Sequence, residues 1–341
     1  MARNIFITGG AGFIGINSAE KFIKNGWKVV IFDNLSRKGS VANLKYLEEK
    51  YKKSFGFIQG DVRDEKFVAT HLRNCDVVLH LAAQVAVTTS VQDPREDFSV
   101  NALGTLNVLE AVRKLSEKPL VIYASTNKVY GRMEEIKIVE GPKRYSYADF
   151  PLGISEQNTL DFHSPYGCSK GCADQYIHDY SRIYDLPTVV FRQSCIYGPH
   201  QFGVEDQGWV AWFIIATALN KPITIYGNGK QVRDVLCVDD LTDLYFTAAQ
   251  NPQKVRGRVY NIGGGPKYTL SLIEFIEHIE KSFNKRLQLR YTDWRPGDQP
   301  VYISDIRTAY HDIGWEPKIA PQEGVEMLTQ WVAQNKHLFT Q

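Results

Sequence analysis

Residues 8–15 read Thr8-Gly9-Gly10-Ala11-Gly12-Phe13-Ile14-Gly15, a glycine-rich stretch that matches the spacing G-x-G-x-x-G. The residues before it, Asn4–Thr8, form a short apolar run with high β propensity. After it, Phe13–Lys24 places apolar side chains at helical spacing. In such a strand-to-helix turn, glycines let the backbone approach a pyrophosphate, and the helix N-terminus attracts its charge. The order predicts a dinucleotide-binding turn; a glycine-rich turn without a ligand is the alternative.

An acidic residue follows the second expected strand. Residues 27–32 form an apolar run that ends at Asp33, 18 residues after Gly15. In dinucleotide-binding folds, an acidic residue at about this distance binds the adenosine ribose 2′-hydroxyl. A carboxylate there repels a 2′-phosphate, so the sequence favours NAD over NADP. Arg37 weakens this preference, because a nearby arginine accommodates a 2′-phosphate. A turn residue without a ligand is the alternative for Asp33.

Short apolar runs alternate with helical patterns through the first 190 residues. Further strands are expected at 55–60, 76–81, 120–124 and 188–192, and helices near 64–73, 94–115 and 166–184. This alternation predicts an α/β fold, a Rossmann-type doubly wound parallel sheet with helices on both faces. Residues that follow the strands, such as Asp61, Gln84 and Thr126, are then expected to line one crevice at the carboxyl ends of the strands.

Beyond residue 195 the pattern loosens, and glycines, prolines and aromatic residues become more frequent. We therefore expect an NAD-binding Rossmann domain over residues 1–192 and 231–262. A smaller interleaved α/β lobe for the substrate is expected over residues 193–230 and 263–341. The length of 341 residues is sufficient for two lobes.

The composition argues against several classes of function. The 40 basic and 38 acidic residues give a net charge of +2, without a basic stripe for nucleic acid or an acidic tail. Five scattered cysteines indicate reduced thiols and a cytoplasmic protein. Cys168 and Cys172 share a helix face, but no second ligand pair accompanies them, so no metal site is expected. The longest apolar stretch, residues 210–219, is too short to span a bilayer.

A second informative segment reads Tyr166-Gly167-Cys168-Ser169-Lys170 and follows Pro165 at the start of an expected helix. Tyr166 and Lys170 are four residues apart, which places them on one helix face. A phenol has a reference pKa of about 10. A neighbouring ammonium and a positively charged nicotinamide are expected to lower that pKa. Such a phenol can accept a proton from a hydroxyl while a hydride leaves the same carbon. A surface pair without function is the alternative.

These segments resemble the extended short-chain dehydrogenase/reductase family, the sugar-nucleotide epimerases and dehydratases. The resemblance covers essentially the whole chain. Its further marks are Gly60-Asp61-Val62-Arg63-Asp64, Leu79-His80-Leu81-Ala82-Ala83, Asn101, Val129-Tyr130-Gly131, Tyr197-Gly198-Pro199 and Tyr226–Asp234. The resemblance implies that Thr126, Tyr166 and Lys170 are catalytic, with Thr126 bound to the reacting oxygen. It also implies that Arg233 and Arg295 hold the diphosphate or nucleotide of the substrate, a task suited to the planar guanidinium.

The resemblance assigns the rest of the expected site in the same way. The residues expected to contact NAD are Gly9, Gly12, Phe13, Ile14, Gly15, Asp33, Asn34, Ser36, Arg37, Asp61, Val62, Leu81, Ala82, Ala83, Gln84, Asn101, Tyr166 and Lys170. The residues expected to contact the substrate are Thr126, Asn127, Lys128, His163, Gln193, Cys195, Gln207, Gly208, Arg233 and Arg295.

Two departures from the family pattern are informative. The 4,6-dehydratases carry Thr-Asp-Glu before Val-Tyr-Gly, and the Asp and Glu supply the acid and base that eliminate water. Here Asn127 and Lys128 occupy these positions, so elimination lacks both groups. The ordinary 4-epimerases usually have small residues there. The second departure is Cys195, where many relatives have Asn, which leaves the usual phosphate or sugar contact at this position open.

Four longer segments are similar to the branch of CDP-hexose 2-epimerases, namely residues 32–39, 125–128, 161–170 and 206–210. This resemblance implies an NAD-dependent nucleotide-sugar epimerase that inverts C2 through a transient 2-keto sugar. It also implies a homo-oligomer, a dimer or tetramer, without nucleic acid or membrane partners. A C4-epimerase of a UDP- or GDP-hexose stays open. A non-catalytic NAD-sensing interaction protein also stays open, although Thr126, Tyr166 and Lys170 are all present and disfavour it.

Overall fold

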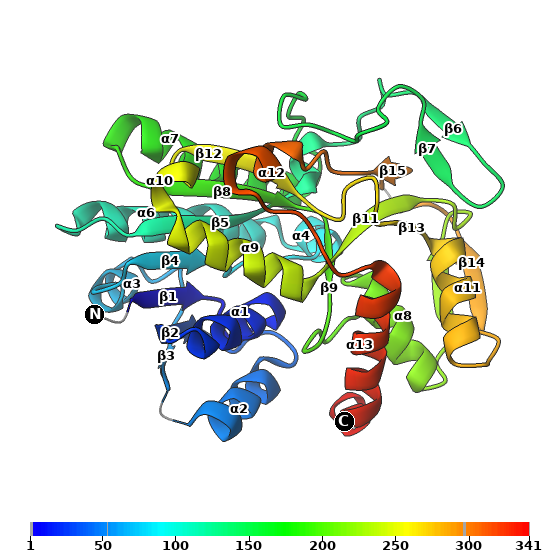
Figure 1. Ribbon diagram of the computed structural model, residues 1–341, viewed down its shortest axis with the longest axis horizontal. Coiled ribbons are helices and arrows are strands. Elements are labelled where there is room, and N and C mark those ends of the chain that lie inside the picture. Colours follow the sequence, from blue (N-terminus) through cyan, green and yellow to red (C-terminus); the bar gives the residue numbers. More distant parts are fainter. Residues whose placement is uncertain (1–2, 53, 296–297, 341) are drawn as a thin grey trace.

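The computed structural model describes residues 3–52, 54–295 and 298–340. Its centre is a sheet of seven parallel strands in the order β12-β8-β5-β4-β1-β2-β3 (Figure 1). The strands are β1 (Asn4–Thr8), β2 (Lys28–Asp33), β3 (Phe55–Gln59), β4 (Val77–His80), β5 (Leu120–Thr126), β8 (Thr188–Gln193) and β12 (Arg258–Ile262). The chain starts in the middle of the sheet, builds one half through β2 and β3, and returns to build the other half. This reversal confirms the expected fold class and opens a crevice between the ends of β1 and β4.

The strands follow the ranges expected from the sequence, although two of them continue further. β5 extends to Thr126 and β8 extends to Gln193, and these two residues are register partners. Pairing between the strands satisfies backbone groups that the local sequence pattern does not reveal. The extension carries both side chains to the edge where the glycine turn lies.

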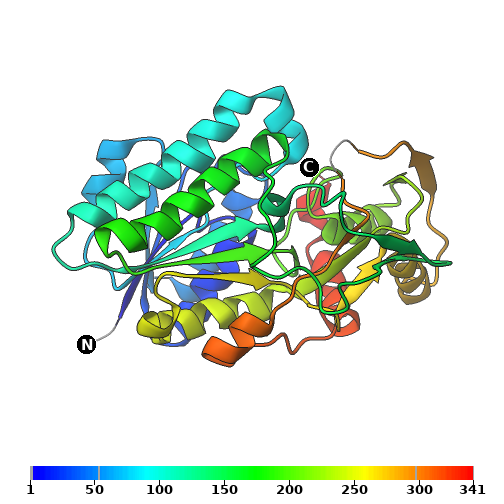
Figure 2. The same ribbon diagram turned by 90° about the horizontal axis from the view of Figure 1, so that it is seen from above.

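Helices cover both faces of the sheet (Figure 2). One face packs against α3 (Glu65–His71), α6 (Gly104–Lys114) and α7 (Ser164–Tyr184). The other packs against α1 (Phe13–Lys24), α2 (Ser40–Tyr51), α9 (Val238–Gln250) and α12 (Arg307–Ile313). Along β1, Phe6 joins the first core, whereas Ile5 and Ile7 join the second. Because both faces are buried, such strands read as continuous apolar runs.

The helix expected over residues 94–115 is divided into three elements: α5 (Pro94–Phe98), the π-helical turn η1 (Ser99–Leu103) and α6. A π turn is rare and frequently lies at a functional site. Its residue Asn101 is buried, and its Oδ1 accepts the backbone N–H of Gln84 at 2.9 Å. The helices α2 and α4 (Val87–Gln92) were not expected, because few buried apolar side chains mark them.

A smaller lobe lies beyond the carboxyl ends of the large sheet (Figure 1). Its strands are β9 (Cys195–Tyr197), β10 (Ile223–Tyr226), β11 (Val232–Cys237), β13 (Thr269–Ser271), β14 (Leu289–Thr292) and β15 (Val301–Tyr302). All of these strands except β15 share a hydrophobic core with α8 (Trp209–Ala218), α11 (Leu272–Ser282) and α13 (Pro321–Gln334). β11 pairs with β9, β13 and β15 in this lobe, and α9 and β12 then return the chain to the large sheet. The division into two domains stays a prediction.

Short elements complete the described residues. They are β6 (Ile138–Glu140), β7 (Tyr145–Tyr147), α10 (Pro252–Val255) and the 3₁₀ turns η2 (Asn127–Tyr130) and η3 (Lys336–Phe339). No helix among residues 3–52, 54–295 and 298–340 is both long and apolar enough to cross a membrane.

The turn after β1 requires glycine at two positions. Gly9 has a φ of +67°, and a Cβ atom there would lie 2.7 Å from the backbone nitrogen of Ala82. Gly15, in the first turn of α1, packs on the turn itself, where a Cβ atom would lie 2.3 Å from the carbonyl oxygen of Gly9. These contacts let α1 begin directly above the sheet, so its N-terminus faces the crevice.

Gly15→Ala is expected to destabilise the protein by about 1–3 kcal/mol, the range typical of overpacking, because the new methyl group meets backbone atoms. Gly56→Ala is the matched control, since a Cβ atom at Gly56 in β3 would contact only Val30, at 3.8 Å. Denaturant-induced unfolding of both variants measures the two changes. Equal destabilisation would contradict the close packing at Gly15.

Candidate functional site

A cavity of ≈ 560 Å³ lies at the carboxyl ends of the parallel strands, and both lobes contribute to its wall. The predicted cofactor contacts that line it are Gly9, Gly12, Phe13, Ile14, Gly15, Asp33, Asn34, Ser36, Arg37, Asp61, Val62, Leu81, Ala82, Ala83 and Gln84. The predicted catalytic and substrate residues that line it are Thr126, Tyr166, Lys170, Gln193, Cys195, Gln207 and Gly208. The structure therefore brings most of the expected site residues to one cavity.

Six predicted site residues do not line this cavity: Asn101, Asn127, Lys128, His163, Arg233 and Arg295. Asn101 is buried and bonded to Gln84, so it shapes the cavity wall from behind. His163 is exposed just before α7. Asn127 is buried, and its Oδ1 accepts the Thr126 hydroxyl at 3.4 Å. Their roles toward a ligand stay predictions.

The Asp33 carboxylate accepts hydrogen bonds from the glycine turn and from the loop after β2. One carboxylate oxygen accepts the backbone N–H of Ala11 at 3.0 Å, and the other accepts the N–H of Leu35 at 2.7 Å. Burial raises the pKa of Asp33, while these backbone hydrogen bonds lower it. The carboxylate is thus held at the end of β2 and faces the cavity, with lone pairs left for the two hydroxyls of a ribose.

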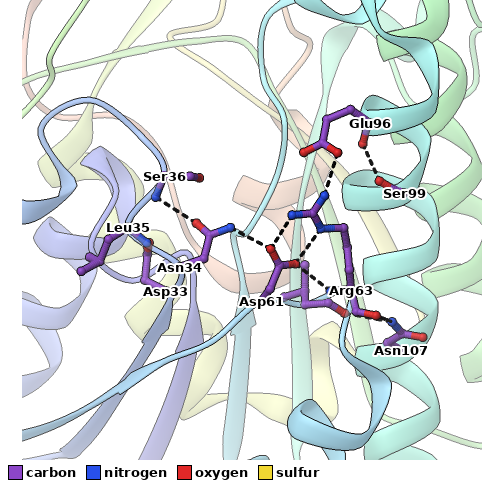
Figure 3. A network of polar contacts seen from close by, with 10 residues as sticks. Asp33, Asn34, Leu35, Ser36, Asp61, Arg63, Glu96, Ser99 and Asn107 are labelled. Atoms are coloured by element: carbon purple, nitrogen blue, oxygen red, sulfur yellow. Dashed lines mark hydrogen bonds and ion pairs between the residues drawn. The ribbon is translucent and has the colours of Figure 1, made fainter.

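A polar network continues the wall beyond Asp33 (Figure 3). The Asn34 amide donates to Asp61 at 2.9 Å, and Arg63 bonds both oxygens of the same carboxylate, at 2.9 and 2.7 Å. Arg63 also pairs with Glu96 at 2.7 Å. The hydrogen bonds from Arg63 lower the pKa of Asp61 to about 2, so Asp61 stays ionised and its orientation is determined by neighbours on both sides.

Arg37 reaches the smaller lobe. Its guanidinium donates a hydrogen bond to the Gln207 side chain. Its charge also acts on Tyr166, whose pKa it lowers. The arginine that could have accommodated a 2′-phosphate is therefore committed to the catalytic side of the cavity, which supports the preference for NAD.

The three predicted catalytic residues meet where β5 ends beside α7. Tyr166 and Lys170 lie on the buried face of α7, as their spacing predicts, and are 9% and 4% exposed. Thr126 lowers the pKa of the Tyr166 phenol. The backbone N–H of Tyr166 donates to the Ser90 hydroxyl at 3.1 Å, which anchors the start of α7 to α4.

The sequence predicted that the Lys170 ammonium and a bound nicotinamide lower the pKa of Tyr166. For the groups of the protein alone, this prediction is wrong. Burial raises the pKa of Tyr166 to about 12, and Thr126 and the charge of Arg37 only partly oppose this. Lys170 is not among the groups that lower it. Its ammonium donates to the carbonyl oxygen of Ala124 at 2.7 Å and lies over the Tyr123 ring, with 4.3 Å between the nitrogen and the ring centroid.

Lys170 is itself strongly affected by burial. Burial lowers the pKa of Lys170 to about 7, while the carboxylates of Asp174 and Asp97 raise it. Asp174 lies on the same helix face, one turn after Lys170, and Asp97 comes from α5. The charge on this lysine near neutral pH therefore depends on two carboxylates from different elements.

Two of the basic residues predicted to bind the substrate contact the same carboxylate. Arg233 donates to Asp298 at 2.6 Å, and the Lys128 ammonium lies 3.8 Å from the same oxygen. Burial lowers the pKa of Lys128, and the neighbouring Arg233 lowers it further. Burial by itself raises the pKa of Asp298, but Arg233 and Lys128 outweigh burial, and the pKa is lowered. The pair of cations carries more positive charge than the single carboxylate neutralises.

Arg295 and Cys195 extend this region. The Arg295 guanidinium stacks on Tyr226, 3.8 Å from the ring centroid, and pairs with Asp206 at 2.9 Å. The Trp209 indole N–H donates to Cys195 Sγ at 3.3 Å. Burial raises the pKa of the Cys195 thiol, while Arg233 and Trp209 lower it. Within the described ranges, no group of three or more His, Cys, Asp or Glu residues could hold a metal ion.

Sequence reasoning missed several residues of this site. The cavity wall also contains Arg63, Thr89, His200, Gln201 and Trp209. Some continue segments that the sequence singled out: Arg63 follows Val62, and Trp209 follows Gly208. By contrast, no local signal marks Asp298 as the partner of Lys128 and Arg233, since three distant segments meet there.

Known proteins are similar to this chain over nearly its whole length. Residues 6–328 match the family described as GDP-mannose 4,6 dehydratase. A protein of Salmonella typhi named CDP-paratose 2-epimerase is 46% identical over 338 residues, which cover 96% of this chain and 99% of that protein.

Two solved structures are also similar. UDP-glucuronic acid 4-epimerase from Bacillus cereus, in complex with UDP-glucuronic acid and NAD, has a TM-score of 0.84 and 28% identity, covering 97% of this chain and 99% of that one. dTDP-glucose 4,6-dehydratase from Bacillus anthracis, in complex with NAD, has a TM-score of 0.81 and 27% identity, covering 99% and 98% of the two chains.

Lys170→Met is expected to change stability in a pH-dependent way. Below about pH 7 the amine is charged in both the folded and the unfolded state, so the folded protein carries the full cost of burying a charge. As the pH rises from about 7 toward the ordinary value of 10.5, only the folded state loses the proton, and the cost disappears. The stability of Lys170→Met relative to wild type should therefore fall as the pH rises through this range.

Urea unfolding from pH 6 to 10 measures this difference. Lys45→Met, at an exposed position on α2, is the control and should show a constant difference. A constant difference for Lys170→Met as well would contradict the burial of its charge.

Proposed function

The chain belongs to the GDP-mannose 4,6-dehydratase family of extended short-chain dehydrogenases/reductases, and we propose that it is a nucleotide-sugar epimerase that inverts C2 of a CDP-hexose of the paratose and tyvelose type. The observation that carries the proposal is the 46% identity to CDP-paratose 2-epimerase over nearly the full length of both chains. The pair Asn127-Lys128 supports it, because the two carboxylates that serve as acid and base in the dehydratases are absent here.

NAD is the cofactor of this family, and the cavity has the features that the dinucleotide requires. The backbone at Gly9 and Gly15 is packed too closely for a side chain, which leaves the N-terminus of α1 open toward a pyrophosphate. Asp33 would hold the adenosine ribose, and Asp61 and Val62 would lie beside the adenine. NAD, when bound, accepts a hydride from the sugar and returns it.

Tyr166 performs the proton transfer in the proposed reaction. Its phenol oxygen takes the proton of the C2 hydroxyl while the C2 hydride leaves, and a 2-keto sugar results. Thr126 donates a hydrogen bond to the reacting oxygen and keeps it near the phenol. After the keto sugar has turned its other face, Tyr166 returns the proton to the oxygen as the hydride returns to C2. Each cycle leaves the tyrosine and the cofactor as they began.

The protein's own groups, Arg37 included, keep the proton on Tyr166 while no cofactor is bound. Burial raises the pKa of the phenol to about 12. Arg37 already lowers this pKa in part, and the positive charge of the bound nicotinamide would lower it further. Ionisation of the tyrosine is therefore expected to depend on the bound cofactor.

The cations of the smaller lobe fit the diphosphate of the substrate. Arg233, Arg295 and Lys128 come from β11, the segment after β14 and η2. A diphosphate carries two negative charges or more, and planar guanidinium groups bind its oxygens in pairs. With the diphosphate bound at this lobe, the sugar extends toward Tyr166.

Two alternative functions are each favoured or disfavoured by one observation. A C4-epimerase is favoured by the similarity to UDP-glucuronic acid 4-epimerase, which has the same fold. An NAD-sensing protein is disfavoured because Thr126, Tyr166 and Lys170 are assembled around one cavity.

The five cysteines are all free thiols, which supports a cytoplasmic location. A homo-oligomer is part of the same proposal.

Tyr166→Phe is expected to lower turnover by roughly 10²–10⁴-fold, because the general base is removed while the ring still fills its site. Tyr176→Phe, at an exposed position on the same helix, is the control and should keep wild-type turnover. The rates are measured by NMR with the accepted nucleotide sugar. A Tyr166→Phe enzyme that retains more than half of the activity would exclude Tyr166 as the base.

A CDP-hexose deuterated at C2 is expected to yield a C2-inverted product that still carries deuterium at C2. The reason is that the hydride passes to the nicotinamide and back without contact with water. NMR of CDP-, UDP- and GDP-hexoses, labelled separately at C2 and C4, identifies the accepted nucleotide and the inverted carbon. Deuterium at C4 is the internal control and should stay in place with an unchanged rate.

Each other result of this labelling experiment has a distinct meaning. Inversion at C4 would overturn the C2 assignment while keeping the role of Tyr166. Loss of the C2 deuterium to water would overturn direct hydride transfer. Turnover of no nucleotide sugar, with NAD still bound, would favour the sensor.

A further inference from the structure

Asp97 on α5 is a buried carboxylate close to the proposed catalytic residues. It is 0% exposed. Its Oδ1 accepts the side-chain amides of Gln84, at 2.9 Å, and Asn101, at 3.1 Å. Its Oδ2 accepts the hydroxyl of Ser169, the residue before Lys170. One carboxylate therefore joins the loop after β4, the π turn η1 and α7.

These hydrogen bonds come from neutral groups only. Among the residues that the structure describes, Asp97 forms no ion pair, in contrast to Asp174, which pairs with Arg192 at 3.0 Å. A buried carboxylate without a cation costs stability. Burial accordingly raises the pKa of Asp97, although hydrogen bonds from Ser169 and Gln84 lower it. A group that weakens the fold in this way calls for a functional reason.

One reason lies in the segment that Asp97 holds. The Gln84 side chain, fixed by Asp97, accepts the N–H of Ala86 at 2.5 Å and donates to its carbonyl oxygen at 2.8 Å. Gln84 itself lines the cavity. The carboxylate thus sets the path of the loop after β4 relative to α7, and these two segments enclose the catalytic end of the cavity.

A second reason is charge. The negative charge of Asp97 raises the pKa of both Lys170 and Tyr166. The other charged or titratable groups that face this pair are few. Asp174 raises the pKa of Lys170, and Arg37 lowers that of Tyr166. The Lys170 ammonium lies over the aromatic ring of Tyr123. Burial lowers the pKa of His80 to about 3, so His80 stays neutral.

We propose that Asp97 is a positioning residue of the proton-transfer site, which joins Gln84 to Ser169 through its carboxylate and places a negative charge near Lys170. This proposal rests on the proposed function, in which Tyr166 and Lys170 carry the chemistry. Asp97 touches neither substrate nor cofactor in this scheme and acts only through its neighbours.

Asp97→Asn tests the charge while preserving the shape. The amide can still accept from Gln84 and Asn101, and its NH₂ group can donate to the Ser169 oxygen. Without the negative charge, the pKa of both Tyr166 and Lys170 falls. Both limbs of the pH–rate profile are therefore expected to move by about one unit toward acid, the size of shift that one nearby charge produces.

Two further variants separate charge from structure. Asp93→Asn removes an exposed carboxylate that caps the same helix, and asparagine caps equally well, so the wild-type profile is expected. Ser169→Ala removes a hydrogen bond but leaves the charge of Asp97, so its rate falls without a shift toward acid. A purely structural role predicts lower rates with unmoved limbs for Asp97→Asn as well, and that result would overturn the proposal.

A readout without turnover separates this proposal from the proposed function. The pH at which the stability gain of Lys170→Met begins to fall is about 7 in the wild-type background. It should move to lower pH in the Asp97→Asn background, whether or not any sugar is turned over. At pH 8, Asp97→Asn alone should unfold at a temperature no lower than wild type. An unmoved onset, or clear destabilisation at pH 8, would overturn the role of Asp97 even if the epimerase activity is found.

Discussion

A buried ion pair between Arg192 and Asp174 holds the catalytic edge of the sheet together. Arg192 lies in β8 and donates two hydrogen bonds of 3.0 Å to Asp174 in α7. The same carboxylate accepts the hydroxyl of Ser125, next to the end of β5, at 2.7 Å. Removal of one partner from such a pair costs roughly 3–5 kcal/mol, because the other charge stays buried and unpaired. The pair therefore determines how β5, β8 and α7 approach one another.

The network continues from this pair into the loops that close the site. Arg192 also donates to the Tyr130 hydroxyl at 3.0 Å, and Tyr130 donates to Asn261 in β12 at 2.7 Å. The backbone N–H of Asn261 donates to Glu156 at 2.7 Å, in the long segment between β7 and α7. Asp174 thus has a structural partner for its charge, whereas Asp97 has only neutral donors. Both carboxylates raise the pKa of Lys170. Burial of Asp174 is offset by its ion pair, whereas burial of Asp97 is offset only by neutral hydrogen bonds.

The site has the fold that epimerases and dehydratases share, but a basic residue stands where the dehydratases have an acidic one. The fold, the glycine turn and the tyrosine–lysine pair are compatible with both epimerases and dehydratases, whose solved structures overlay this chain closely. The segment after Thr126 differs, because Lys128 brings a cation to a place where an elimination needs a carboxylate. Lys128 shares Asp298 with Arg233, so two basic side chains and one carboxylate meet in the region proposed to hold the diphosphate of the substrate.

The sequence by itself determined the features that depend on local spacing and chain direction. The glycine turn, Asp33 at the end of β2, the parallel sheet, and Tyr166 with Lys170 on one helix face all follow from short-range patterns. Only the tertiary structure decided what depends on burial and on contacts between distant segments. It divided the expected helix over 94–115, directed Arg37 to the smaller lobe, and showed that the protein's own groups raise the pKa of Tyr166. The physical reason is that desolvation and charge act through space, so their sign at a given side chain is set by neighbours that the local sequence does not contain.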